Sequence, residues 1–62
     1  MLQEYQQRVV DEKSALDEKI AKLKAFTDVK RDIPAREVAR LGEQLYHMVN
    51  YSKILGERID AF

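Results

Sequence analysis

The sequence predicts an all-α fold, an antiparallel hairpin of two long helices that assembles into a homo-oligomeric helical bundle. Three observations predict it. Glycine and proline are absent between Leu2 and Phe26, two long stretches carry apolar residues at steps of three and four, and one proline, Pro34, separates these stretches. Because residues three and four apart lie on the same side of a helix, each stretch has one apolar stripe. We expect a single helical-hairpin domain over residues 1–62.

The first helix is expected over residues 2–26, where the good helix formers Glu, Gln, Lys, Leu and Ala dominate. Glu12 and Lys13 interrupt its apolar stripe at one level. The opposite face is charged, and the pairs Glu4–Arg8, Lys13–Asp17 and Glu18–Lys22 stand four residues apart, where opposite charges can meet. These pairs support the helix and indicate no function. The stripe itself consists of Leu2, Tyr5, Val9, Leu16, Ile20 and Leu23.

Residues 27–33 form the expected bend. Pro34 lacks an amide proton and restricts the residue before it, so a helix can begin at this position but cannot continue through it. Proline is favoured in the first turn of a helix, and the carboxylate of Asp28 or of Asp32 is a candidate cap for the amides that the second helix leaves unbonded. The sequence leaves the choice between the two aspartates open.

The second helix is expected over residues 34–60. Ser52 and Gly56 lie near the middle of its apolar stripe, where large side chains would otherwise be expected. A glycine inside a helix is less stable than alanine by about 1 kcal/mol, so a close contact with another helix is a physical reason for Gly56. The stripe consists of Val38, Leu41, Leu45, Met48, Val49, Leu55, Ile59 and Phe62.

A short connection folds two such helices back on each other as an antiparallel pair. In that pair, the polar level of Glu12 and Lys13 meets the small level of Ser52 and Gly56. Either packed side chains fill the space that the small residues leave, or a polar pocket forms there.

Self-association is expected from size and composition. A lone domain of 62 residues buries only about 60% of its unfolded surface, and the chain has no cysteine and one histidine with which to add disulfides or metal sites. Oligomerisation is the remaining source of stability. The candidate interface residues lie away from the stripe centres or allow close approach, and they are Val10, Phe26, Tyr46, Tyr51, Ile54, Gly56 and Phe62.

The charge balance argues against nucleic acid as a partner, because eleven basic and eleven acidic residues give a net charge of zero. No apolar run approaches the roughly 18 residues of a membrane span. The first residues lack the basic start and apolar stretch of a signal peptide. We therefore expect a soluble cytoplasmic protein that does not bind membranes.

Residues able to carry catalysis or hold a metal are sparse. The only histidine, His47, lies mid-helix with no glycine-rich turn nearby, and the adjacent carboxylates Asp17 and Glu18 point about 100° apart on a helix. A metal site needs several converging ligands, and the best companion for His47 is Glu43, one turn away. We expect no enzymatic activity, no metal and no cofactor.

A second face of the second helix carries ligand-binding chemistry. His47, Tyr51, Ile54 and Arg58 follow one another at steps of four, three and four, and Arg40 and Gln44 extend this face. Aromatic rings stack on nucleobases, and guanidinium groups hold phosphates. Near the N-terminus the same chemistry recurs, so the candidate ligand-binding residues are Tyr5, Arg8, Tyr51 and Arg58. The alternative is an oligomer interface, where Tyr and Arg are also enriched.

The chain also resembles a family of small phage and prophage proteins of similar length, catalogued as related to a crAss-like phage protein. The resemblance covers nearly the whole chain and is weakest around the bend. It rests on Arg8, Val9, Glu12, Leu16, Leu23 and Phe26, and on Met48, Tyr51, Ser52, Leu55, Arg58 and Ile59. The two-helix shape is similar to the hairpins of phage anti-CBASS and anti-Thoeris sponges, oligomers that sequester nucleotide signals of bacterial immunity.

These resemblances imply a phage accessory protein in the host bacterial cytoplasm, acting in counter-defence as a non-catalytic oligomeric sponge for a cyclic nucleotide immune signal. The alternative is a helical protein-interaction module, also of coiled-coil type, that binds a host or phage protein through an exposed helix face.

Overall fold

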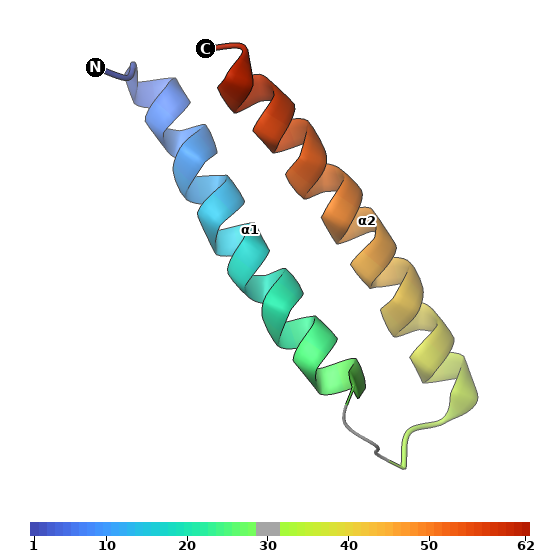
Figure 1. The fold of residues 1–62 in the computed structure, drawn as a ribbon. Helices are drawn as coiled ribbons and strands as arrows, with labels where there is room; N and C mark the ends of the chain where they lie inside the picture. Colours follow the sequence, from blue (N-terminus) through green and yellow to red (C-terminus); the bar gives the residue numbers. More distant parts are fainter. Residues whose placement is uncertain (29–31) are drawn as a thin grey trace.

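The computed structural model describes residues 1–28 and 32–62. Helix α1 spans Glu4–Asp28 and helix α2 spans Ala35–Asp60, and the described part of the chain contains no strand. The two helices run antiparallel, side by side, so that both termini lie at one end of a rod (Figure 1). The predicted all-α hairpin is confirmed, and its assembly into a larger bundle stays a prediction.

Helix α1 begins two residues later and ends two residues later than the sequence pattern suggests. At its start, the side-chain oxygen Oε1 of Gln6 accepts a 2.8 Å hydrogen bond from the backbone amide of Gln3. This is half of a capping box, in which a residue of the first turn bonds back to the residue that precedes the helix. The middle of the expected bend, residues 29–31, lies outside the described residues.

Helix α2 is capped by proline and not by an aspartate. Pro34 occupies the N-cap position with φ −54° and ψ 141°, and no side chain bonds to the cap. Its carbonyl oxygen instead accepts the amides of Glu37, at 2.9 Å, and Val38, at 3.1 Å. The expectation that Asp28 or Asp32 caps this helix is wrong, because the N-cap position is held by Pro34, whose side chain has no acceptor, and Asp28 ends α1.

The core is a single row of side chains along the seam between the helices. Four apolar residues of the described part of the chain are buried, and Leu45, Met48 and Ile59 pack against them. The four are Val9, Leu16, Ile20 and Leu55. The row is narrow because each helix has only one neighbour, so only the centre of each predicted stripe is covered.

The edges of the predicted stripes are exposed. Val38 and Val49 are 51% and 42% exposed, so their assignment to the core is wrong. Val49 directly follows Met48, and consecutive helical residues point about 100° apart, so only one of the two can face α1. Leu2, Tyr5 and Phe62 are also exposed, at the end of the rod where the seam runs out.

The hairpin is long and thin. Its extents are 48 × 15 × 13 Å and its radius of gyration is 14.5 Å. A compact domain of this length would have a radius of gyration of about 11 Å. The hairpin therefore leaves two broad faces, one on each side of the seam.

Candidate functional site

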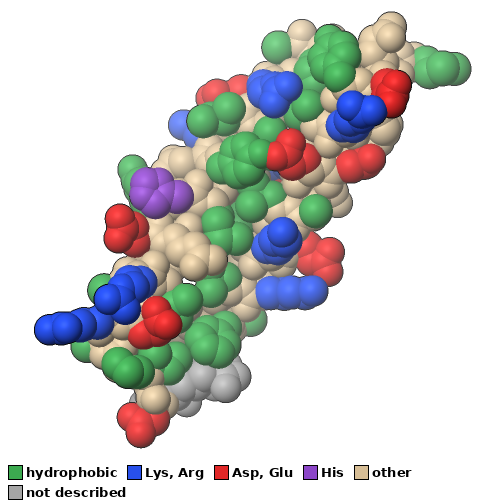
Figure 2. Space-filling view, turned by 180° about the vertical axis from the view of Figure 1, so that it is seen from behind, with side chains coloured by type: hydrophobic (Ala, Val, Ile, Leu, Met, Phe, Trp, Pro, Cys, Tyr) green, Lys and Arg blue, Asp and Glu red, His purple; other side chains and the backbone are tan. Residues whose placement is uncertain are grey.

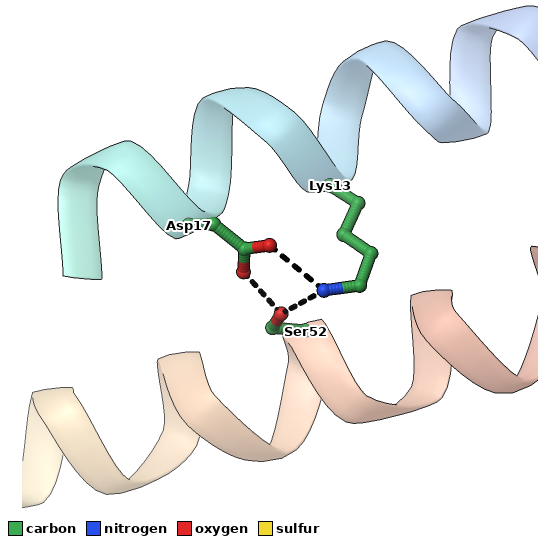
Figure 3. Close-up of polar contacts among 3 residues, drawn as sticks. All are labelled: Lys13, Asp17 and Ser52. Atoms are coloured by element: carbon green, nitrogen blue, oxygen red, sulfur yellow. Dashed lines mark hydrogen bonds and ion pairs between the residues drawn. The ribbon is translucent and has the colours of Figure 1, made fainter. Parts of the chain in front are cut away.

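A polar cluster crosses the seam near its middle (Figure 3). The ammonium group of Lys13 donates to Asp17 Oδ2 at 2.8 Å and to Ser52 Oγ at 3.0 Å. The Ser52 hydroxyl in turn donates to Asp17 Oδ1. We call Lys13, Asp17 and Ser52 the seam triad; it is the one point at which side-chain hydrogen bonds link α1 to α2 among the described residues.

Gly56 makes room for the seam triad. A Cβ atom added at Gly56 would lie 3.3 Å from Cε of Lys13, which is closer than ordinary packing. The lysine stem therefore fills the space that the missing side chain leaves. The predicted meeting of Lys13 with Ser52 and Gly56 is confirmed, in the form of packed side chains, whereas Glu12 is exposed.

The triad satisfies its own polar atoms. Ser52 is only 8% exposed, and no buried side-chain nitrogen or oxygen lacks a partner in the described residues. The hydrogen bonds from Lys13 and Ser52 lower the pKa of the Asp17 carboxyl, since both stabilise its charged form and together outweigh its slight desolvation. Ser52 accepts a hydrogen bond from Lys13 and donates its hydroxyl proton to Asp17, so the triad binds α2 to α1 and leaves no free serine hydroxyl.

Asp17 is the member that sequence reasoning misplaced. The predicted Lys13–Asp17 pair exists, but it lies at the seam and not on the opposite, solvated face. The available signal was that Lys13 interrupts the apolar stripe, so a partner four residues away also lies near that stripe. The predicted pairs Glu4–Arg8, at 2.5 Å, and Glu18–Lys22, at 3.2 Å, are confirmed on the surface.

Tyr5, Arg8 and Arg58 lie toward the end of the rod where the termini meet, whereas Tyr51, next to Ser52, lies at the level of the seam triad. The Tyr5 and Phe62 rings pack edge to face, with centroids 5.9 Å apart. Tyr5, Tyr51 and Arg58 are exposed, and Arg8 is paired with Glu4. No hydrogen bond or ring contact joins these candidates to one another within residues 1–28 and 32–62.

Ile54 and Arg58 point away from Gly56 and from the stem of Lys13. Ile54 and Arg58 each stand two residues from Gly56, about 200° around the helix, and Gly56 contacts Lys13. Figure 2 shows one broad face, on which hydrophobic side chains alternate with basic and acidic ones and which carries the single histidine. His47 shares its side of α2 with Tyr51 and Arg58, because the three are spaced four and seven residues apart.

Cations on this face are available to a ligand. Arg40 and Arg58 are exposed and form no ion pair with any described residue. The same holds for Arg36 in the first turn of α2. Arg8 would have to exchange Glu4 for an incoming anion.

The candidate interface residues are dispersed over both faces. Tyr46, Tyr51, Ile54, Phe26 and Phe62 are exposed and Val10 is half-buried. Gly56 has a function inside the hairpin, as the space for Lys13. No group of three acidic or histidine side chains close enough to hold a metal ion occurs among the described residues. Neither described helix has an apolar stretch that would cross a bilayer.

Fold and site define a class of protein: a small helical hairpin, fastened at its seam, with one face that carries tyrosines and unpaired arginines. The family model Sequestin matches residues 3–61, so this chain belongs to the Sequestin family. The family name denotes a sequestering protein, in agreement with the resemblance to hairpin sponges. The comparisons found no match among curated proteins and none among solved structures.

Proposed function

We propose that this chain is a phage counter-defence protein, a non-catalytic oligomeric sponge that sequesters a cyclic nucleotide signal of bacterial immunity. The observation that carries the proposal is the unpaired, exposed Arg58 on the same side of α2 as Tyr51, in a chain of the Sequestin family. Tyr5 and Arg8 supply the same pair of chemical groups from α1.

The chemistry of these residues suits an anionic nucleotide. Tyrosine rings stack on a base, and a guanidinium group donates paired hydrogen bonds to phosphate oxygens. An arginine without an ion pair of its own, such as Arg58, offers this binding without first giving up a partner. Arg40 and His47 add further donors along the same helix.

The shape of the hairpin supports a ligand held between protomers. Small-molecule sites enclose about 70–90% of the surface of a ligand. One face of a rod 13–15 Å thick covers only one side of a nucleotide. A second copy supplies the other side, which is why the proposal joins binding to self-association.

Calorimetry against a panel of cyclic dinucleotides, cyclic trinucleotides and cyclic ADP-ribose isomers tests the proposal. We expect one member to bind and to be recovered chemically unchanged after the protein is heat-denatured, because a sponge binds without turnover. Absence of binding by the whole panel would remove the ligand from the proposal. Recovery of a converted nucleotide would contradict the non-catalytic mechanism.

Arg58→Gln is the sharpest variant for this site. A hydrogen bond to a charged group contributes about 1.5–3 kcal/mol, so its loss should weaken nucleotide binding by roughly ten- to hundredfold. Arg36→Gln is the matched control, because Arg36 is also an exposed, unpaired arginine of α2 but lies at the bend end of the helix. Equal losses in the two variants would indicate non-specific attraction of an anion.

A protein-interaction module is the second candidate, favoured by the large exposed side chains of Tyr46 and Ile54. Capture of a host or phage protein from infected cells by the wild type, and not by Ile54→Gln, would support it. Recovery of the chain alone would count against it.

A further inference from the structure

One row of small and apolar residues on α2 is left exposed by the hairpin, and the ring contact within it joins Tyr46 to the neighbouring His47. We call it the outer stripe, and it consists of Val38, Ala39, Gly42, Tyr46 and Val49. All five are exposed, Tyr46 by 65%. The sequence pattern places Val38 and Val49 in the core stripe and, of these five residues, only Tyr46 in an interface. The hairpin buries none of the five, so this row is a surface that the hairpin itself does not use.

Gly42 stands out because the hairpin gives no reason for it. A Cβ atom at Gly42 would meet nothing within 4 Å, whereas one at Gly56 would press on Lys13. Glycine inside a helix is less stable than alanine. Gly56 is explained by a neighbour within the chain, whereas no described residue explains Gly42.

The exposed area is large enough for such a neighbour. The chain exposes 5140 Å², and a compact monomer of its mass would expose about 4,200 Å². The excess of about 900 Å² is close to the roughly 800 Å² that each partner buries in a stable protein interface.

We propose that a second copy of this chain packs on the outer stripe, with the two α2 helices antiparallel about a two-fold axis and Tyr46 of each copy seated over Gly42 of the other. The pairs Gly42–Tyr46 and Ala39–Val49 have the same midpoint along α2. A two-fold axis at that midpoint therefore forms each of the two contacts twice, because in a symmetric interface residue i of one copy meets j of the other and j meets i.

This arrangement leaves the nucleotide face free. Gly42, Val49 and Gly56 are spaced seven residues apart and so share one side of α2, the side opposite to Ile54 and Arg58. The copies join back to back, and Tyr51 and Arg58 of both remain open. The inference rests on the self-association in the proposed function and adds a second contact to it. The outer stripes join two copies, and the open face of each copy, with Tyr51 and Arg58, meets a further copy that encloses the nucleotide.

Sedimentation velocity without nucleotide tests the outer stripe with Gly42→Gln. Glutamine favours a helix more than glycine does and meets open space within the hairpin, so the fold is retained, as circular dichroism would verify. We expect the variant to sediment at a lower mass than the wild type, with a dissociation constant for self-association at least ten times higher. Tyr46→Ala, which removes the ring, should do the same. Tyr51→Ala, five residues and about 140° around α2 from Tyr46, is the matched control and should sediment as the wild type does.

A monomeric wild type at micromolar concentration, or a Gly42→Gln variant that associates as the wild type does, would overturn the inference. Dissociation by Tyr51→Ala alone would also overturn it, because the contact would then lie on the other face. Nucleotide binding is scored separately by calorimetry. If the wild type self-associates, Gly42→Gln lowers its mass and neither binds nucleotide, the outer-stripe contact stands and the nucleotide ligand of the proposed function is wrong. If the wild type binds nucleotide as a monomer, the ligand of the proposed function stands and the outer-stripe contact is wrong.

Discussion

The apolar levels of the seam and its polar level hold the two helices together in different ways. At the apolar levels, Val9 and Leu55 are buried with contacts that depend on area and not on direction. At the polar level, Lys13 and Ser52 bond with fixed geometry. Sliding one helix by a turn, about 5.4 Å, would leave apolar residues facing apolar residues but would separate Lys13 from Ser52. The apolar levels thus supply free energy, and the seam triad selects the register.

Leu55→Ala should have the largest effect on the apolar side of this comparison. Leu55 is the most buried residue, at 1% exposed. Truncation of a buried leucine lowers the free energy of unfolding by about 2–5 kcal/mol, a large share of the stability of so small a domain. Urea unfolding followed by circular dichroism measures it. Ile54→Ala, one residue away but exposed, is the control and should change stability by less than about 0.5 kcal/mol. Similar losses in both variants would mean that the seam is not where the stability lies.

Ser52→Ala should have a smaller effect, on the polar side. The substitution removes the acceptor for Lys13 and a donor to Asp17 but leaves the Lys13–Asp17 ion pair in place. A lost hydrogen bond of this kind lowers the free energy of unfolding by about 1 kcal/mol. Ser14→Ala on the exposed side of α1 corrects for the better helix propensity of alanine. If Ser52→Ala were as stable as Ser14→Ala, the seam triad would contribute nothing to folding.

Acidification should lower the stability least of the three changes. Within the seam it should act on the polar level, because the apolar levels have no group that titrates. The pKa of Asp17 is lowered by its hydrogen bonds from Lys13 and Ser52. Its contribution to stability is therefore present above the unfolded-state pKa, near the ordinary aspartate value, and is lost as pH falls through the lower pKa of the folded state. Urea midpoints measured across this range should fall less steeply for Asp17→Asn than for the wild type. An NMR titration that placed the Asp17 pKa at or above its ordinary value would contradict the hydrogen-bonded geometry.

The helices and the level at which they meet were predictable from the sequence, because period and spacing determine both. Lys13 interrupts one stripe where Ser52 and Gly56 reduce the other, and antiparallel pairing brings these levels together. The position of Asp17 at the seam was missed. A spacing of four residues predicts that Asp17 can pair with Lys13, but it does not tell whether the pair faces the other helix or solvent. The N-cap position of Pro34 was missed because its contacts to α2 are made by the backbone carbonyl, which every residue type has, so the sequence does not reveal them.

The width of the core could not be predicted, because it depends on how many neighbours a helix has. Val38 and Val49 would be buried in a bundle of more helices and are exposed in a pair. Periodicity alone cannot distinguish these cases, since a stripe that faces a second chain has the same spacing as one that faces the first. The candidate residues Tyr5, Arg8, Tyr51 and Arg58 stay a prediction for the same reason, because a site completed by another copy is not contained in one chain.

The position of the bend relative to the contacts has a kinetic consequence. The Tyr5–Phe62 contact joins the two helices at the end of the rod where the termini lie, whereas the Lys13–Ser52 bond lies closer to the bend. Loop-closure entropy rises only slowly with loop length, but it is smallest for the contacts nearest the bend. The chain therefore gains most by pairing from the bend outward, and the seam triad is reached before the terminal aromatic rings. In a misaligned pair Lys13 keeps Asp17 but both lack the Ser52 hydroxyl, and this loss is met while half of the seam is still open to correction.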